Sequence, residues 1–284
     1  MSYLRVRVRT ALSRSGLPDL DYSLNPYVGC LHGCAYCYAR SYTYAKDVAE
    51  NWGRVIYIKE NILEVLDDET KKRKPGVVGV STVTDPYQPV EAVELLTRRS
   101  IELLLRRGFR VSVQTKSPLV LRDLDVLSSH RDRVDVGFTI ITMDPEQAAL
   151  LEPRAPPPKE RARALARIAG EGIRTWLFYG PVIPGINDSA ESLAEVLGEV
   201  GGRVDLVFID KLRVTKEVER SMRAIIDGFN SVLSLAGRQD WWSRVRGELL
   251  AVCEKAGVRC VPSLAEPAER RSRSLADFGS RPPT

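Results

Sequence analysis

The sequence predicts an α/β fold in which a mostly parallel sheet is covered by helices. Short apolar runs rich in β-branched residues recur along the chain and indicate buried strands. Each is followed by a stretch with apolar residues at helical spacing, which indicates a helix packed on the sheet. With one strand before or at the cysteines, the pattern gives about six β/α units, short of the eight of a closed TIM barrel.

The first expected element is a half-exposed strand over residues 3–10, YLRVRVRT, in which charged and apolar residues alternate. Arg5, Arg7 and Arg9 share its polar face, which suits an edge strand protected against aggregation. A basic rim for a polyanion is the alternative interpretation of this face. The next expected segments are a turn-rich approach over residues 13–25, a helical stretch over 35–50 and a short strand running into a helix over 56–66.

The regular part of the pattern begins at residue 77. Strands are expected over residues 77–84, 110–116, 134–141, 174–182 and 204–210, and helices over 90–107, 119–129, 158–171, 189–200 and 216–235. Ligands of such folds gather at the C-terminal ends of the strands, so functional side chains are expected just after each strand.

The C-terminal part is expected to hold a helix over residues 238–256, a short strand over 258–263 and a polar tail over 265–284 that is poorly packed or drapes over the barrel. The chain then divides into an N-terminal strand and approach (1–20), a barrel domain (21–235) and a C-terminal region (236–284).

Composition and charge limit the class of protein. The chain has 284 residues, 44% of them hydrophobic and 28% charged, as in an ordinary globular protein with a sizeable core. A net charge of +5 permits an anionic substrate, although a solvated arginine-rich surface explains it equally well. No apolar run approaches the ~20 residues that span a bilayer, and no signal-peptide pattern is present. We therefore expect a cytoplasmic protein with no membrane partner.

The stretch CLHGCAYCY carries three of the five cysteines, Cys30, Cys34 and Cys37. A structural zinc ion takes four protein ligands, and an electron-transfer [4Fe-4S] cluster is normally bound by four cysteines. Three cysteines would leave one iron of a cluster without a protein ligand, so that a small molecule could coordinate it. A zinc site completed by His32 is the alternative, at a spacing that is unusual for zinc.

This triplet, with Tyr36 before its last cysteine, resembles the signature of the radical S-adenosylmethionine (radical SAM) enzymes. The surrounding NPYVGCLHGCAYCYAR, residues 25–40, resembles the spore photoproduct lyase-like branch of that superfamily. Further segments resemble blocks of the same branch in the same order: STVTDPYQPVE (81–91), QTKSPLVLRDLDVL (114–127), FTIITMDPEQAALLEPRAPPPKER (138–161) and GPVIPGIND (180–188). The resemblance implies an open (β/α)6 partial TIM barrel with the [4Fe-4S] loop at the C-terminal ends of the strands.

The resemblance also implies the cofactors. Cys30, Cys34 and Cys37 would each bind one iron of a [4Fe-4S] cluster, and the amino and carboxylate groups of SAM would bind the fourth. A reducing electron donor such as ferredoxin or flavodoxin would reduce the cluster. The 5′-deoxyadenosyl radical released from SAM would then act on an unidentified substrate, for which nucleic acid is a candidate.

Four residues at two adjacent strand ends are predicted to contact the methionine part of SAM. Thr82, Thr84 and Asp85 stand where the superfamily binds the amino group. Lys116, at the end of the next strand, is expected to pair with the carboxylate. Strand-end capping or surface pairing is the alternative for each of them.

Further contacts are expected beyond these strand ends. Tyr36 is predicted to pack on the adenine, with an ordinary buried tyrosine as the alternative. Thr139 or Thr142 is predicted to reach the ribose hydroxyls, and Arg154 to bind an anionic group. Tyr38 follows the last cysteine, and tyrosines near the cluster are linked to radical transfer in spore photoproduct lyases.

The sequence departs from spore photoproduct lyases in its cysteines. Those enzymes use a cysteine beyond the cluster loop as hydrogen-atom donor, and here none occurs between Cys37 and Cys253. Repair of spore photoproduct by that route is therefore not expected. Cys253 and Cys260 are interpreted as buried small hydrophobic residues, with a disulfide or a redox role as alternatives.

The leading hypothesis is thus a radical SAM enzyme with an unidentified substrate. One alternative is a non-catalytic iron–sulfur protein that transfers electrons or senses redox state, which would have no need of Lys116. The other is a nucleic-acid-binding protein with a structural metal.

Overall fold

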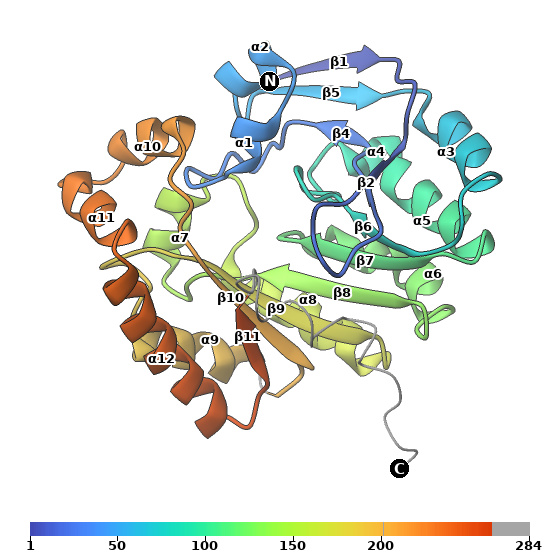
Figure 1. The fold of residues 1–284 in the computed structure, drawn as a ribbon. Helices are drawn as coiled ribbons and strands as arrows, with labels where there is room; N and C mark the ends of the chain where they lie inside the picture. Colours follow the sequence, from blue (N-terminus) through green and yellow to red (C-terminus); the bar gives the residue numbers. More distant parts are fainter. Residues whose placement is uncertain (201, 263–284) are drawn as a thin grey trace.

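The computed structural model describes residues 1–200 and 202–262 and shows an open sheet with helices on its outer side (Figure 1). The polar tail expected over residues 265–284 and the last residue of the strand expected over 258–263 lie outside the described residues.

The main sheet has the strand order β11-β10-β9-β8-β7-β6-β3-β2. The strands are β2 (Leu12–Arg14), β3 (Tyr22–Leu24), β6 (Val77–Val80), β7 (Arg110–Thr115), β8 (Val134–Thr139), β9 (Arg174–Val182), β10 (Leu206–Lys211) and β11 (Cys260–Pro262). All neighbouring pairs are parallel except β2 with β3. β2 and β11 are the two ends of this order, so the barrel is open, which confirms the predicted α/β partial barrel.

Helices follow the strands of the barrel, and most of them cover its outer side (Figure 1). The helices are α3 (Ile62–Thr70), α4 (Glu91–Glu94), α5 (Leu96–Arg106), η1 (Pro118–Asp123), α6 (Leu124–Ser128), α7 (Pro145–Leu151), α8 (Pro158–Gly170), α9 (Ala190–Val200), α10 (Lys216–Arg223), α11 (Phe229–Ala236) and α12 (Gln239–Lys255). Helices α7, α10 and α11 instead pack near Cys34 and Tyr36, beside the cysteine loop. No helix in the described part of the chain is long and apolar enough to cross a membrane.

Two predicted helices are interrupted by left-handed backbone. Leu95, with φ 56°, separates α4 from α5 inside the helix expected over residues 90–107. The single helix expected over 216–235 is likewise divided: α10 ends at Arg223, and Gly228, with φ 68°, directly precedes α11. Helix α7 was not expected, although its start carries a recognisable signal. The Asp144 carboxylate accepts hydrogen bonds from two backbone N–H groups of the first turn, and Pro145 occupies the first helical position.

A second, small sheet has the order β1-β5-β4 and lies beside the cysteine loop. It consists of β1 (Ser2–Val6), β4 (Tyr27–Val28) and β5 (Val55–Lys59), and the short helices α1 (Ala39–Tyr42) and α2 (Lys46–Glu50) lie next to it (Figure 1). Two of the three arginines predicted to share the polar face of the first strand are paired with acidic residues: Arg5 with Glu94 at 2.8 Å, and Arg7 with Glu60 at 3.6 Å. This pairing favours the interpretation as an edge strand over a basic rim.

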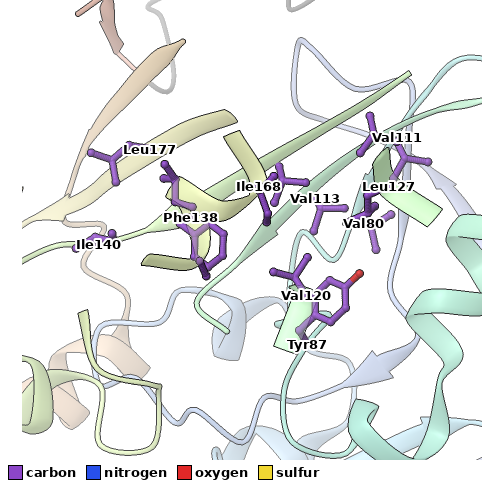
Figure 2. Close-up of a cluster of buried hydrophobic side chains, with 14 of the residues drawn as sticks. Val80, Tyr87, Val111, Val113, Val120, Leu127, Phe138, Ile140, Ile168 and Leu177 are labelled. Atoms are coloured by element: carbon purple, nitrogen blue, oxygen red, sulfur yellow. The ribbon is translucent and has the colours of Figure 1, made fainter. Parts of the chain in front are cut away.

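Strand residues that point outward form the core against the helices. Figure 2 shows Val113 and Phe138 from two strands beside Val120 and Ile168 from the covering helices, all buried completely. Burial of each such side chain contributes about 1.5–3 kcal/mol relative to exposure. The alternate residues of the strands line a cavity inside the barrel, among them Gly79, Ser112 and Gln114.

The C-terminal cysteines correct one prediction. Cys253 in α12 and Cys260 in β11 form a disulfide, with their Cα atoms 6.0 Å apart. Cys253 is buried as expected, but the interpretation of the two as separate small hydrophobic residues is wrong. The turn at Gly257, with φ 66°, reverses the chain after α12 and brings both cysteines together, a geometry that the sequence pattern did not indicate.

Candidate active site at the strand ends

The cysteine loop follows directly after β4, and its path requires glycine at two positions. Gly29 and Gly33 have φ values of 86° and 65°, in the left-handed region that favours glycine. A Cβ atom on Gly29 would lie 2.7 Å from Val48 Cγ1 and 2.8 Å from the carbonyl oxygen of Val55. The loop is therefore pressed against the small sheet and turned toward the barrel.

All three cysteines of the loop are free and line one cavity of about 100 Å³. Its other lining residues are His32, Tyr38, Ala39, Trp52, Ser81, Thr82, Val83, Thr84, Asp85, Gln114, Thr115, Lys116 and Thr139. Most of these come from the loop and from the C-terminal ends of β6, β7 and β8, whereas Ala39 begins α1 and Trp52 lies between α2 and β5. The predicted position of the cysteine loop at the strand ends is thus confirmed.

The environment of the thiols is buried. Burial raises the pKa of the Cys34 thiol to about 12, although Lys116 offsets part of this effect. The pKa values of Cys30 and Cys37 are also raised, again mainly by burial. Metal ligation requires thiolates, so a cationic centre in this cavity would supply the charge that stabilises them.

Asp85 connects the cysteine loop to the ends of two strands. Its Oδ1 accepts hydrogen bonds from Thr115 Oγ1 at 2.7 Å and from the Tyr87 N–H at 2.9 Å. Its Oδ2 accepts one from the Lys116 N–H at 2.8 Å and lies 3.4 Å from His32 Nδ1. Burial alone would raise the pKa of Asp85, but the contacts with His32 and Thr115 lower it to about 2. Both oxygens therefore already have protein partners.

Thr84 and Gln88 fix the backbone of the loop before Cys30 and after it. Gln88 Nε2 donates to the Gly29 carbonyl at 3.1 Å, and Gln88 Oε1 accepts from the Leu31 N–H at 2.9 Å. Thr84 Oγ1 also donates to the Gly29 carbonyl. Gln88 is completely buried, and sequence reasoning missed its role.

A buried charge cluster lies behind Cys34. The Glu152 carboxylate pairs with Arg161 at 2.5 Å, accepts a hydrogen bond from the Tyr36 hydroxyl, and lies 3.9 Å from Lys116 Nζ. Burial would raise the pKa of Glu152, but Arg161 and Lys116 lower it, so the group is a carboxylate. Two cations surround one anion, which leaves a net positive charge facing the cavity at Lys116.

The family model that describes the radical SAM superfamily matches residues 24–197. The chain belongs to the radical SAM superfamily. Membership implies an enzyme that cleaves SAM by radical chemistry and carries an iron–sulfur cluster. The matched region contains the cysteine loop, Asp85, Lys116 and the Glu152 cluster.

Two relatives in the same size range cover most of this radical SAM chain. An uncharacterized protein of Acidianus two-tailed virus, ORF301, is 28% identical over 253 residues, which is 78% of this chain and 82% of the relative. An uncharacterized protein of Methanocaldococcus jannaschii, MJ0683, is 31% identical over 189 residues, 65% of this chain and 69% of the relative.

Solved structures of spore photoproduct lyase share the fold. The structure complexed with dinucleoside spore photoproduct has a TM-score of 0.71 at 16% identity and covers 92% of this chain and 82% of the lyase. A double mutant of the lyase with bound AdoMet and the same photoproduct has a TM-score of 0.71 at 16% identity and covers 93% and 82%. At this identity the similarity shows the radical SAM fold alone.

The residues predicted to contact SAM fall into two groups. Thr82, Thr84, Asp85, Lys116 and Thr139 line the cysteine cavity together, and the others do not. Thr139 Oγ1 accepts a hydrogen bond from Gln114 Nε2 at 3.1 Å. Contact of these residues with SAM remains a prediction.

The predicted residues outside the cavity lining have protein partners of their own. The Tyr36 ring is buried, with Lys116 Nζ 5.6 Å from its centroid. Arg154 donates to the Leu31 carbonyl at 2.9 Å and packs against Gly33, behind the loop. Thr142 contacts Gln147 at the start of α7, whereas Thr139 faces the cavity, so Thr139 is the better placed of the two for a ribose.

The donor set of the cavity fits an iron–sulfur cluster. No group of three His, Cys, Asp or Glu side chains in residues 1–200 and 202–262 converges closely enough for a single metal ion. Ligands of a cluster bind separate irons and need not converge on one point. Three free cysteines around one cavity, with Lys116 at its edge, meet that requirement.

A second cavity, of about 530 Å³, adjoins the first inside the barrel. Both cavities are lined by Tyr38, Ser81, Thr82, Val83 and Gln114. Ser81 has φ 65°, an uncommon conformation for a residue other than glycine and one that concentrates at functional sites. The Tyr38 hydroxyl donates to the Thr82 carbonyl at 3.0 Å, across the same boundary.

Proposed function

We propose that this chain is a radical SAM enzyme in which Cys30, Cys34 and Cys37 bind a [4Fe-4S] cluster and leave one iron for SAM. The observation that carries the proposal is the single cavity lined by all three free cysteines and by the ends of three adjacent strands. An electron passed through the cluster from an external reductant such as ferredoxin or flavodoxin would break the C5′–S bond of SAM, giving methionine and a 5′-deoxyadenosyl radical that takes a hydrogen atom from the substrate.

The protein's own side chains orient SAM in this proposal. Lys116 pairs with the SAM carboxylate, because the surrounding cluster carries one positive charge more than negative and Lys116 is its exposed member. Thr82 and Thr84 supply oxygen atoms near the ammonium group. Asp85 acts on that group mainly through its charge, since both of its oxygens bind protein donors. Thr139, at the end of β8 next to the β7 end that carries Lys116, is assigned to the ribose.

The substrate class that we infer is nucleic acid. The net charge of +5 is compatible with a polyanion. Tyr42 lines the second cavity and is 67% exposed, and tyrosines in such a position stack on bases of single strands. The spore photoproduct lyase structures of the same fold hold a dinucleoside photoproduct. The hydrogen-atom donor must differ from a cysteine in the barrel, because the chain has none between Cys37 and Cys253.

Cluster reconstitution tests the enzyme. The protein is loaded with iron and sulfide without oxygen, reduced with dithionite and given SAM, and 5′-deoxyadenosine is measured together with iron content. Cys34→Ala should lose 5′-deoxyadenosine, whereas Cys260→Ala, which removes one half of the disulfide outside the cavity, should keep it. Equal product from Cys34→Ala would contradict the proposal, and iron binding without SAM binding would favour the electron-transfer alternative.

Oligonucleotide binding tests the substrate class. Affinity for single-stranded DNA and RNA should fall steeply as salt rises, because phosphate contacts release counterions. Absence of binding at low salt, in protein that cleaves SAM, would exclude nucleic acid while leaving the SAM chemistry intact.

A further inference from the structure

The second cavity is built mainly from residues that point into the barrel. Its lining comes from the N-terminal segment 15–20, from β6, β7, β9 and β10, and from Tyr38 and Tyr42 beside the cysteine loop. Its volume of about 530 Å³ is in the range of small-molecule sites, about 300–1,000 Å³. Because it shares a wall with the cysteine cavity, a group bound here would lie next to a group bound there.

Aromatic rings form one wall of this cavity. Trp176 and Phe208 meet edge to face, with their centroids 5.3 Å apart and their planes at 87°. Phe178 lies on the same strand as Trp176 and also lines the cavity. Stacking on such rings is selective for flat groups and tolerant of their identity.

Polar side chains also line the second cavity. Ser112 and Gln114 of β7 line the cavity. Ser112 Oγ donates to Asp135 and Gln114 Nε2 donates to Thr139, so the hydroxyl and amide oxygens of the two side chains can still act as acceptors.

The charged residues at the β10 end, Asp210 and Arg213, form an ion pair at 2.9 Å and thus offset each other. Asp19, on the N-terminal segment, is the other charged residue among the described residues of the lining. Since these residues include no excess of basic side chains to bind an anion, the lining suits an uncharged flat ring with polar atoms at its edge.

Hydrogen bonds as well as packing fix the position of the Trp176 indole. Its Nε1 donates to Asp135 Oδ1 at 2.8 Å, and Ser112 Oγ donates to the same oxygen at 2.6 Å. Asp135 lies on β8, between the strands that carry Trp176 and Ser112. The buried side chain of Asp135 therefore fixes the indole through this hydrogen bond.

The indole of Trp176 packs directly against the backbone of Gly137. Gly137 is the cross-strand partner of Trp176, and a Cβ atom added to it would lie 2.2 Å from Trp176 Cδ2 and Cε2. Any larger residue at position 137 would force the indole toward the cavity. By contrast, a Cβ atom added to Gly198 in α9 would have no contact within 4 Å, so alanine at this position should displace no neighbouring atom.

We propose that the second cavity binds a planar, uncharged heteroaromatic ring of the substrate, and that Trp176, seated on Gly137 and held by Asp135, determines which rings fit. The inference rests on the proposed function, because it assigns the group that faces the SAM site. The ring belongs either to a free nucleoside-like molecule or to a base within a polynucleotide, since both present the same faces and edges.

The first test measures ring binding separately from SAM chemistry. Thymidine and single-stranded oligo(dT) serve as probes, and binding is followed by ligand-observed NMR on the anaerobically purified full-length protein. Gly137→Ala should weaken binding at least about 5-fold, the lower end of the range expected when a stacking contact is lost. Gly198→Ala should bind as the wild type does.

A double variant distinguishes displacement of the indole from general damage. Trp176→Ala removes the stacking face, and adding Gly137→Ala to it should change affinity by less than about 2-fold, because the displaced group is gone. Trp176→Phe keeps a ring and should retain most binding even if Gly137→Ala folds poorly. Unfolding temperatures of all variants show which of them are folded.

The outcomes separate this inference from the proposed function. Thymidine binding indicates that a free ring suffices, and oligo(dT) binding alone indicates a base within a strand. Each supports the inference if Gly137→Ala weakens it. Absence of binding to both probes, or equal binding by wild type, Gly137→Ala and Trp176→Ala, overturns it. Failure to form 5′-deoxyadenosine with ring binding intact would overturn the proposed function instead.

Discussion

The carboxylate of Glu152 and the guanidinium of Arg161 form an ion pair in which both side chains are almost completely buried. Arg161 also donates to the carbonyls of Pro156 and Thr139. Glu152 in turn accepts from the Tyr36 hydroxyl, two residues from Cys34 along the chain. The pair therefore links helix α8 and the end of β8 to the cysteine loop.

Loss of Arg161 should destabilise the protein strongly. Arg161→Met removes the cation nearest to the buried Glu152 carboxylate and leaves Lys116, 3.9 Å away, as the remaining cation of the cluster. Breaking a buried ion pair by removing one partner costs about 3–5 kcal/mol of unfolding free energy. Urea unfolding of the two proteins measures the difference. Arg163→Met on the same helix is the matched control: its side chain is 74% exposed and paired with Glu160, so about 0–1 kcal/mol is expected. Equal losses for the two variants would contradict a structural role for the buried pair.

The carboxylate beneath Trp176 should make stability depend on pH. Burial raises the pKa of Asp135, although Ser112 and Trp176 partly oppose the shift. A group whose pKa is raised on folding favours the folded state most when it is protonated. Its contribution is therefore present below the unfolded pKa of about 3.9 and is lost as pH rises through the folded value.

Asp135→Asn tests this dependence, because asparagine keeps an oxygen acceptor for both donors and cannot ionise. The unfolding free energy of the wild type, relative to that of Asp135→Asn, should fall as pH rises from about 4 toward neutrality. Urea unfolding across this pH range gives the comparison. A constant difference between the two proteins would show that Asp135 does not titrate differently in the folded state.

The regular strands could be predicted from the sequence because their burial leaves a local signature. The observed β7 and β9 lie within or match the expected ranges, since outward-facing valines and leucines recur with β-branched neighbours. The breaks at Leu95 and Gly228 could not be predicted in the same way. Both depend on left-handed backbone conformations that the apolar pattern does not encode.

Some residues of the candidate site could also be predicted from the sequence, and others could not. The three cysteines were singled out by their spacing and by the family resemblance. That Thr84 and Lys116 would lie near each other could be predicted because parallel strands bring their C-terminal ends to one edge, and both line the cysteine cavity. Glu152 could not be predicted, because its partner Tyr36 is 116 positions away and a buried carboxylate has no local signature. The same holds for Gln88, whose partners are backbone groups of a distant loop.

Gln88 should be needed for the shape of the cysteine loop. Gln88→Leu removes the hydrogen bond to the Gly29 carbonyl and the one from the Leu31 N–H. Leaving a buried backbone group without a partner lowers the unfolding free energy by about 1–3 kcal/mol. We expect a loss of that size in unfolding free energy and less iron retained per chain after reconstitution. Gln239→Leu, at an exposed position at the start of α12, is the control and should change neither quantity. Full iron retention by Gln88→Leu would show that the loop keeps its shape without this side chain.

The disulfide should stabilise the edge of the sheet without taking part in the SAM chemistry. Cys253 and Cys260 are separated by seven positions, and closing so short a loop is worth roughly 2 kcal/mol in the chain-entropy model. Cys260→Ser should lower the unfolding free energy by about that amount, because the crosslink no longer restricts the unfolded chain. Thiol counting by mass spectrometry under denaturing conditions identifies the bonded pair in the wild type. The yield of 5′-deoxyadenosine should stay unchanged, since β11 is separated from the cysteine cavity by β10 and β9 in the strand order. A loss of 5′-deoxyadenosine in Cys260→Ser with normal iron content would instead connect this bond to the reaction.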